Sequence, residues 1–155
     1  MTESVFQRIE RLLAEHDVAF GVLRHEPVYT SEESAAVRGV PLSSGAKALI
    51  CKAGEQFVMF VLPADRKLDG RRARQGRAWK KLRFANREEV LELTGLKPGS
   101  IPPFGNLFDL PTYCDSALGQ NETINFNAGD HSISVSMSYA DYLRVEQPEL
   151  GAFSA

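Results

Sequence analysis

The stretch Ser43-Ser44-Gly45-Ala46-Lys47-Ala48-Leu49-Ile50-Cys51-Lys52 predicts a buried strand that begins directly after a glycine-containing turn. Lys47 is the one charged residue inside this otherwise apolar run. Burying an ammonium group without a partner is costly, so a lysine in this setting usually lies at a strand end or faces a cleft. Two interpretations follow. Lys47 is a site residue, or its side chain only extends past the strand end to reach water.

The predicted strand continues into a hairpin, because a second apolar run, 56–62, follows the turn Ala53-Gly54-Glu55. Further strands are predicted at 20–25, 81–85, 112–114, 123–126 and 132–138, and helices at 5–16, 31–38, 70–76, 87–94 and 140–146. Short strands mixed with helices, without strict alternation, predict an α+β fold. We expect a single domain over residues 1–155, built on a curved, barrel-like mixed β-sheet that short helices flank.

A second segment, Gly95-Leu96-Lys97-Pro98-Gly99-Ser100-Ile101-Pro102-Pro103-Phe104-Gly105, predicts a rigid loop with free backbone amides. Proline restricts φ and so helps to fix the directions of those amides. A lysine combined with a stiff, amide-lined loop provides what an anionic or carbonyl-bearing ligand requires. The two segments together therefore predict a ligand site.

Composition describes an ordinary globular chain of 155 residues with 43% hydrophobic and 25% charged residues. At this length a domain buries about 70% of its unfolded surface. No apolar run approaches the roughly 18 residues of a membrane span, and the first residues lack the features of a signal peptide. Cys51 and Cys114 are therefore predicted to be reduced thiols, and the protein to be cytoplasmic, without a membrane partner.

Basic residues are concentrated between Arg66 and Arg83. These eighteen positions hold nine of the eighteen lysines and arginines and one acidic residue, Asp69. Such a cluster can bind the phosphates of a nucleic acid, for which Arg71, Arg72, Arg74, Lys80 and Lys81 are the candidate residues. The alternative is a solvated helix face, and the phosphate-binding role requires the cluster to lie beside the Lys47 cleft.

Several familiar catalytic patterns do not occur in the sequence. It has no P-loop motif and no Gly-x-Ser-x-Gly elbow. His16, His25 and His131 have no ligand-like spacing with the cysteines, so no metal site is expected. The remaining chemistry consists of positioned amides, one lysine and the substrate's own hydroxyl. Hydrolysis of an aminoacyl-tRNA ester suits such a site, because the ester is already activated and a ribose hydroxyl adjoins it.

Seven short motifs, taken in order, resemble one family. They are Arg24-His25-Glu26-Pro27-Val28, Gly45-Ala46-Lys47-Ala48-Leu49, Leu62-Pro63-Ala64-Asp65, Glu92-Leu93-Thr94-Gly95, Gly99-Ser100-Ile101-Pro102-Pro103-Phe104, Phe126-Asn127-Ala128-Gly129 and Ala140-Asp141-Tyr142-Leu143. The chain resembles the YbaK/prolyl-tRNA synthetase-associated editing domain family, closest to its freestanding YeaK-like members. The resemblance extends from the first helix to about Leu150.

The resemblance implies a trans-acting deacylase that clears wrongly attached amino acids from tRNA. Lys47 matches the family's main functional lysine, which engages the phosphate of the terminal adenosine. The loop from Gly99 to Pro103 matches the family's Gly-x-x-x-Pro loop, whose amides lie near the ester and the water. Gly99 and Ser100 are therefore the other catalytic candidates, and Ile101, Pro102, Pro103 and Phe104 are expected to shape the pocket. The resemblance implies no metal and no organic cofactor.

Two departures limit the transfer of amino-acid specificity. Alanine-specific relatives carry a histidine near the position of Asn127, and cysteine editors carry an aspartate near Ser134. Asn127 and Gly129 remain candidates for the pocket, or Asn127 is only a turn residue. Serine, threonine or alanine are the leading substrates, because an editing pocket works best by excluding a larger residue.

Four weaker candidates have structural alternatives. Thr30 lines the pocket or only caps its helix, and His25 is a ligand-contacting or a structural histidine. Phe104 walls the pocket or fills the core, and Cys51 borders the pocket or is a buried thiol.

Two functions compete with the deacylase hypothesis. One is a non-catalytic module of the same fold that binds tRNA or a synthetase. The other is a hydrolase of small esters without a tRNA role, whose rate would barely respond to salt, whereas tRNA binding weakens steeply as salt rises. The predicted partners are the aminoacylated 3′ end of tRNA and an aminoacyl-tRNA synthetase.

Overall fold

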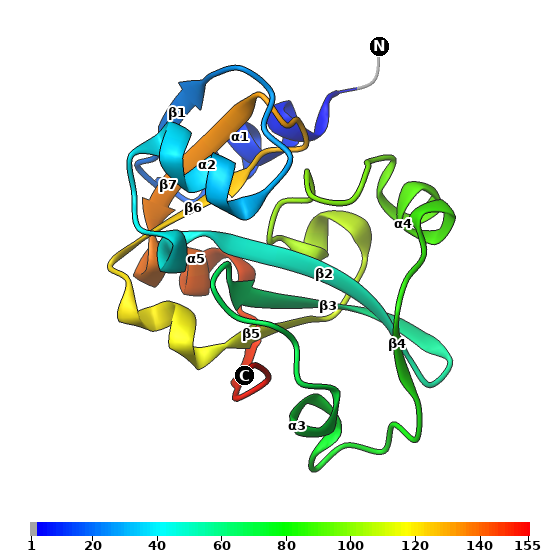
Figure 1. Cartoon of the computed structure of the whole chain (residues 1–155). Coiled ribbons are helices and arrows are strands. Elements are labelled where there is room, and N and C mark those ends of the chain that lie inside the picture. The colour runs from blue at the N-terminus through cyan, green and yellow to red at the C-terminus, as the bar shows by residue number, and fades with distance from the viewer. Residues whose placement is uncertain (1–2) are drawn as a thin grey trace.

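The computed structural model describes residues 3–155, whose strands form two sheets (Figure 1). A three-stranded antiparallel sheet has the order β1 (Gly21–Arg24), β7 (Ile133–Ser138), β6 (Thr123–Asn127). A five-stranded mixed sheet has the order β4 (Leu82–Phe84), β2 (Ala46–Ala53), β3 (Gln56–Pro63), β5 (Thr112–Asp115), β8 (Glu149–Gly151). The predicted α+β class is confirmed, although the strands are divided between two sheets where the sequence predicted one.

The β2–β3 hairpin is the centre of the larger sheet. Its eight-residue strands pair antiparallel from Ala46–Pro63 to Ala53–Gln56. Alternate side chains of β3 enter two different apolar clusters, because successive residues of a strand point to opposite faces. Met59 and Val61 enter the main core, whereas Val58, Phe60 and Leu62 pack with Phe153 on the other face. Burial on both faces explains the continuous apolar run in the sequence.

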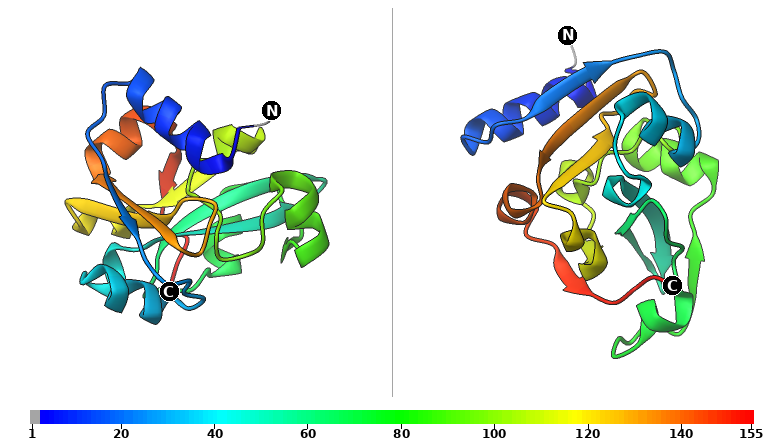
Figure 2. Two further views of the ribbon diagram at one scale, coloured as in Figure 1. Left: turned by 90° about the horizontal axis from the view of Figure 1, so that it is seen from above. Right: turned by 60° about the vertical axis from the view of Figure 1, so that its left-hand side comes forward.

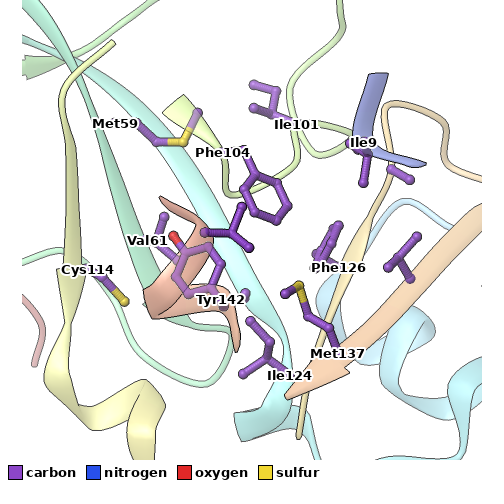
Figure 3. Close-up of a cluster of buried hydrophobic side chains, with 14 of the residues drawn as sticks. Ile9, Met59, Val61, Ile101, Phe104, Cys114, Ile124, Phe126, Met137 and Tyr142 are labelled. Carbon is purple, nitrogen blue, oxygen red and sulfur yellow. The ribbon is translucent and has the colours of Figure 1, made fainter. Parts of the chain in front are cut away.

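The two sheets are arranged as Figure 2 shows, and the main core, part of which Figure 3 shows, is built from side chains of both. Ile9 and Leu13 reach it from α1 (Val5–Glu15), and Tyr142 reaches it from α5 (Tyr139–Glu146). Phe126 and Val135 come from the smaller sheet. An isolated parallel bridge between Gly45 and Asn125 joins the two sheets. Only a glycine suits this position, because a Cβ on Gly45 would lie 2.9 Å from the Cβ of Ala64.

The remaining helices begin at side-chain caps that the sequence predicted. Thr30 and Asn86 form capping boxes at the starts of α2 (Ser31–Arg38) and α4 (Arg87–Thr94). Asp69 caps α3 (Gly70–Arg74). Three short 3₁₀ turns, at Leu42–Ser44, Gly105–Phe108 and Ser116–Gln120, and the strand β8 were not predicted. Across residues 3–155, no helix is both long enough and apolar enough to cross a membrane.

Candidate active site

A cavity of about 170 Å³ opens where the two sheets meet. Its walls come from α2, the turn at Leu42–Ser44, the start of β2, the end of β6 and the loop that contains Gly99. Small side chains line one part of it, namely Ala35, Ala46, Ala48 and Ala64. Polar side chains line another part, namely Thr30, Ser31, Ser34, Arg38, Lys47, Asn125 and Asn127. The volume is below the roughly 300–1,000 Å³ of typical ligand pockets, so the cavity suits a small group.

Lys47 lies at the second residue of β2 and contributes its half-buried side chain to the cavity wall. Its ammonium group donates a hydrogen bond to the carbonyl oxygen of Arg66, which leaves two N–H donors for a ligand. Burial lowers the pKa of Lys47, while the negative charges of Asp65 and Glu32 oppose this shift and Lys67 adds to it. The side chain is therefore a tethered cation at the edge of the cavity.

The loop after α4 brings Gly99 and Ile101 to the cavity. Gly99 has φ +91°, a left-handed conformation that glycine adopts without strain. Its carbonyl oxygen accepts a hydrogen bond of 2.8 Å from the side-chain amide of Asn127. Within residues 3–155 no acceptor engages the Gly99 N–H, whereas the Ser100 N–H donates to the carbonyl oxygen of Lys97 at 3.2 Å. Of the two predicted amides, that of Gly99 is therefore the one without an acceptor in the described chain.

The loop continues with three buried residues that do not line the cavity, namely Pro102, Pro103 and Phe104. The carbonyl oxygen of Pro103 accepts a hydrogen bond of 2.7 Å from the hydroxyl of Tyr142. The Phe104 ring packs edge-on against Phe126 and Tyr142, with centroid distances of 5.5 and 5.4 Å (Figure 3). Of the two interpretations of Phe104, the structure supports the core residue. The three residues anchor the loop from below.

Arg38, at the end of α2, is a cavity residue that the sequence did not indicate. Its Nε donates to the Ser134 hydroxyl at 2.8 Å, and its Nη2 donates to Oδ1 of Asn127 at 3.0 Å. The Ser134 hydroxyl is also 2.8 Å from Nε2 of His25. Burial lowers the pKa of Arg38 to about 10. No distinctive signal marks Arg38 in the sequence, because an arginine before a C-terminal glycine is common in helices.

Thr30, Gly129 and His25 have structural partners in the described chain. Thr30 lines the cavity and also caps α2, so both interpretations hold. The Gly129 N–H donates to the carbonyl oxygen of Ser100 at 2.8 Å and so fastens the loop to the end of β6. Neither Gly129 nor His25 lines the cavity, although His25 supports Ser134.

The candidate tRNA-binding residues lie on a different surface from the cavity. Figure 1 shows α3 well away from α2, and none of these five residues lines the cavity. They line two shallow grooves around α3: Arg71, Arg72, Arg74, Lys80 and Lys81. These five residues therefore do not lie beside the cleft, although Arg66, at the start of the basic segment, accepts the hydrogen bond of Lys47. Their role in tRNA binding stays a prediction, and it requires the bound tRNA to reach from the cavity to α3.

Cys51 and Cys114 are both free and buried, as predicted. Burial raises the pKa of each thiol to about 12, so neither is a ready nucleophile. Cys51 does not line the cavity, so the interpretation as a small buried thiol holds. Among residues 3–155, no three His, Cys, Asp or Glu side chains are grouped to hold a metal ion.

A family model of the aminoacyl-tRNA editing domain matches residues 25–145. The chain therefore belongs to the aminoacyl-tRNA editing domain family. The matched region contains Lys47, the Gly99 loop and Asn127. The predictions of this family and of an editing enzyme are confirmed.

Two curated relatives place the chain within this family. The Escherichia coli (strain K12) protein "Multifunctional Ser/Thr-tRNA deacylase ProXp-y" is 38% identical over 152 residues, which cover 95% of this chain and 91% of that protein. The proline–tRNA ligase of Trichlorobacter lovleyi is 33% identical over 103 residues, 61% of this chain and 18% of the ligase. The domain thus has relatives both as a separate chain and inside a synthetase.

A solved structure has the same fold. It is that of a candidate trans-editing enzyme for prolyl tRNA synthetase, with 22% identity and a TM-score of 0.86 over 100% of this chain and 99% of that one. At this identity the likeness supports the fold and says nothing further of the substrate.

Proposed function

We propose that this protein is a trans-acting deacylase that removes serine and threonine from wrongly charged tRNA. The observation that carries the proposal is the small cavity lined by Lys47, Arg38 and Gly99, whose N–H has no acceptor in the described chain. The 38% identity to a Ser/Thr-tRNA deacylase supports the choice of amino acids. A cavity of about 170 Å³ accommodates a small side chain and excludes a large one by size.

In the proposed reaction, water attacks the carbonyl carbon of the aminoacyl ester, and the bond from that carbon to the ribose oxygen breaks. The proton that water loses goes to the departing ribose oxygen, with the neighbouring ribose hydroxyl as the relay. The products are a free amino acid and an uncharged tRNA. No general base from the protein is required, because the ester is already activated.

Lys47 and Gly99 act on different parts of the substrate in this proposal. The Lys47 ammonium, with two N–H donors free, binds the phosphate of the terminal nucleotide. The Gly99 amide donates to the ester oxygen as negative charge develops there. Ser100 acts by position, since its amide and hydroxyl both donate to Lys97 and its carbonyl oxygen holds Gly129.

Asn127 and Arg38 form the polar side of the pocket. The Asn127 amide is held between the carbonyl oxygen of Gly99 and the Arg38 guanidinium. The Arg38 N–H groups not used by Ser134 and Asn127 are available to a hydroxyl on the substrate's side chain. This arrangement favours serine and threonine over alanine.

The cellular setting follows from the substrate. A tRNA deacylase works in the cytoplasm on tRNA released by a synthetase. Because relatives of the domain occur within proline–tRNA ligases, a synthetase is the second proposed partner.

Deacylation of Ser-, Thr-, Ala- and Cys-tRNA by the wild type and by Lys47→Ala tests the proposal. We expect hydrolysis of Ser- and Thr-tRNA and its loss in Lys47→Ala. Arg87→Ala is the control, since Arg87 is an exposed cation at the start of α4 that lines neither the cavity nor the grooves around α3. Absence of turnover on all four substrates would contradict the deacylase, and full activity in Lys47→Ala would contradict the site.

A further inference from the structure

Tyr29 presents a large aromatic ring to solvent beside the cavity. It is 71% exposed, the largest exposed fraction among the large hydrophobic residues of the described chain. Its ring is tilted against that of His131, with the centroids 4.7 Å apart. The two side chains therefore form a pair of rings in which that of Tyr29 is exposed, and the proposed chemistry assigns no part to it.

This pair lies at the border of two depressions. Tyr29 lines the Lys47 cavity and also an adjoining groove that contains His131 and Lys97. A Cβ on Gly99 would lie 3.4 Å from Nε2 of His131, so the pair directly adjoins the proposed ester-binding amide. The two rings therefore lie at the side of the cavity that Gly99 lines.

The backbone behind the rings is fixed. The Val28 N–H donates to the carbonyl oxygen of His131 at 3.1 Å, which ties the segment before Tyr29 to the segment of its partner ring. Directly after Tyr29, Thr30 and Glu33 form the capping box of α2. A ring on a fixed backbone loses little conformational entropy when a ligand stacks on it.

We propose that Tyr29 and His131 form a stacking platform for the nucleobase of the substrate's terminal nucleotide. This inference rests on the proposed function, because the ester in the cavity is attached to the ribose of that nucleotide. The base on the same ribose must then lie close to the mouth of the cavity, where the platform is. Aromatic side chains bind single-stranded bases by stacking, and lysines such as Lys97 and Lys47 on either side supply partners for the phosphates.

The test uses a short RNA hairpin that carries the tRNA 3′ end, charged with serine, and a second hairpin whose terminal nucleotide lacks its base. On the complete hairpin we expect Tyr29→Ala to raise KM about 5- to 100-fold with little change in kcat. Tyr29→Phe keeps the stacking face and should stay within about twofold of the wild type. Phe84→Ala, which removes an exposed ring 59% accessible on β4, is the control and should leave KM unchanged.

The base-free hairpin separates stacking from a general structural effect. The wild type should bind the base-free hairpin as weakly as Tyr29→Ala binds the complete hairpin. The Tyr29→Ala substitution should not weaken binding of the base-free hairpin any further. If Tyr29→Ala weakens the binding of both hairpins equally, or of neither, the stacking platform is refuted while the proposed deacylase activity stands. If the wild type hydrolyses neither hairpin, the proposed function fails. In that case, fluorescence anisotropy of the two uncharged hairpins tests the platform alone. A platform requires the wild type to bind the complete hairpin more tightly than the base-free one, and Tyr29→Ala must abolish this preference.

Discussion

Glu146 is a buried carboxyl group whose ionisation opposes folding at neutral pH. It is the last residue of α5 and only 3% exposed. Its Oε2 accepts hydrogen bonds from the Thr112 hydroxyl at 2.6 Å and the Asn106 N–H at 3.2 Å. Its Oε1 is buried without a partner in the described part of the chain. Burial raises the pKa of Glu146 to about 7, against the opposing effect of these hydrogen bonds.

The sign and the size of the effect follow from this shift. The pKa of Glu146 in the folded state is above the ordinary value of 4.5. The contribution of the protonated carboxyl group to stability is therefore complete below pH 4.5 and is lost as pH rises towards 7. A shift of about 2.5 pKa units corresponds to about 3 kcal/mol, of which about 2.5 kcal/mol is lost between pH 5 and pH 8. Glu146→Gln keeps an acceptor oxygen of the same shape and cannot ionise. The free energy of unfolding of Glu146→Gln, minus that of the wild type, should therefore increase by about 2.5 kcal/mol from pH 5 to pH 8.

Urea denaturation of both proteins at pH 5, 6, 7 and 8 measures this difference. Comparison with the wild type at each pH cancels the titration of every other group. Glu122→Gln removes an exposed carboxylate and should show no such trend. A difference between Glu146→Gln and the wild type that is equal at pH 5 and pH 8 would refute the reasoning.

Four further substitutions or conditions test the site. Arg38→Lys keeps the charge but loses the planar fork, so kcat/KM on Ser-tRNA should fall about 10-fold with little change in the melting temperature, as kinetics and thermal unfolding will show. Gly99→Ala places a Cβ at φ +91°, so urea denaturation should show a loss of about 1–2 kcal/mol and single-turnover assays a slower reaction. Lys47→Met removes an ammonium group whose pKa is lowered by burial, so the melting temperature of the variant at pH 7 should rise while its deacylation activity is lost. If Arg71 and Arg74 contact tRNA, replacing both by alanine should reduce the slope of log binding constant against log salt concentration by about two in magnitude. An unchanged slope would contradict that role.

Elements defined by neighbours in the sequence were predicted well. The capping boxes at Thr30 and Asn86 involve residues three positions apart, and the β2–β3 hairpin closes over a turn at Gly54. Such signals are local, so the sequence alone displays them. The strand β8 was missed because Glu149–Gly151 is short and pairs with β5, which is distant in the sequence.

The candidate site was only partly predictable for the same reason. Lys47 and Gly99 carry local signals, a charge within an apolar strand and a glycine in a proline-rich loop. Arg38 becomes a site residue only when α2 packs beside β6 and β7, 89 and 96 residues further along the chain. Phe104 belongs to an apolar motif in which the sequence cannot distinguish a pocket wall from the core.

The treatment of buried charge distinguishes the cavity from the rest of the molecule. Burial would raise the pKa of Asp115, yet hydrogen bonds of 2.8 Å from the N–H groups of Ala117 and Phe153 help to lower it overall, so the fold provides a donor for each carboxylate oxygen. Arg38 and Lys47 are treated in the opposite way, because burial lowers the pKa of both. In the described chain their side chains make hydrogen bonds to neutral groups and no ion pair within 4 Å. A buried cation without an anionic partner destabilises the fold more than a paired one. In the proposed function, the phosphate and carbonyl oxygens of the substrate are the partners that Lys47 and Arg38 lack.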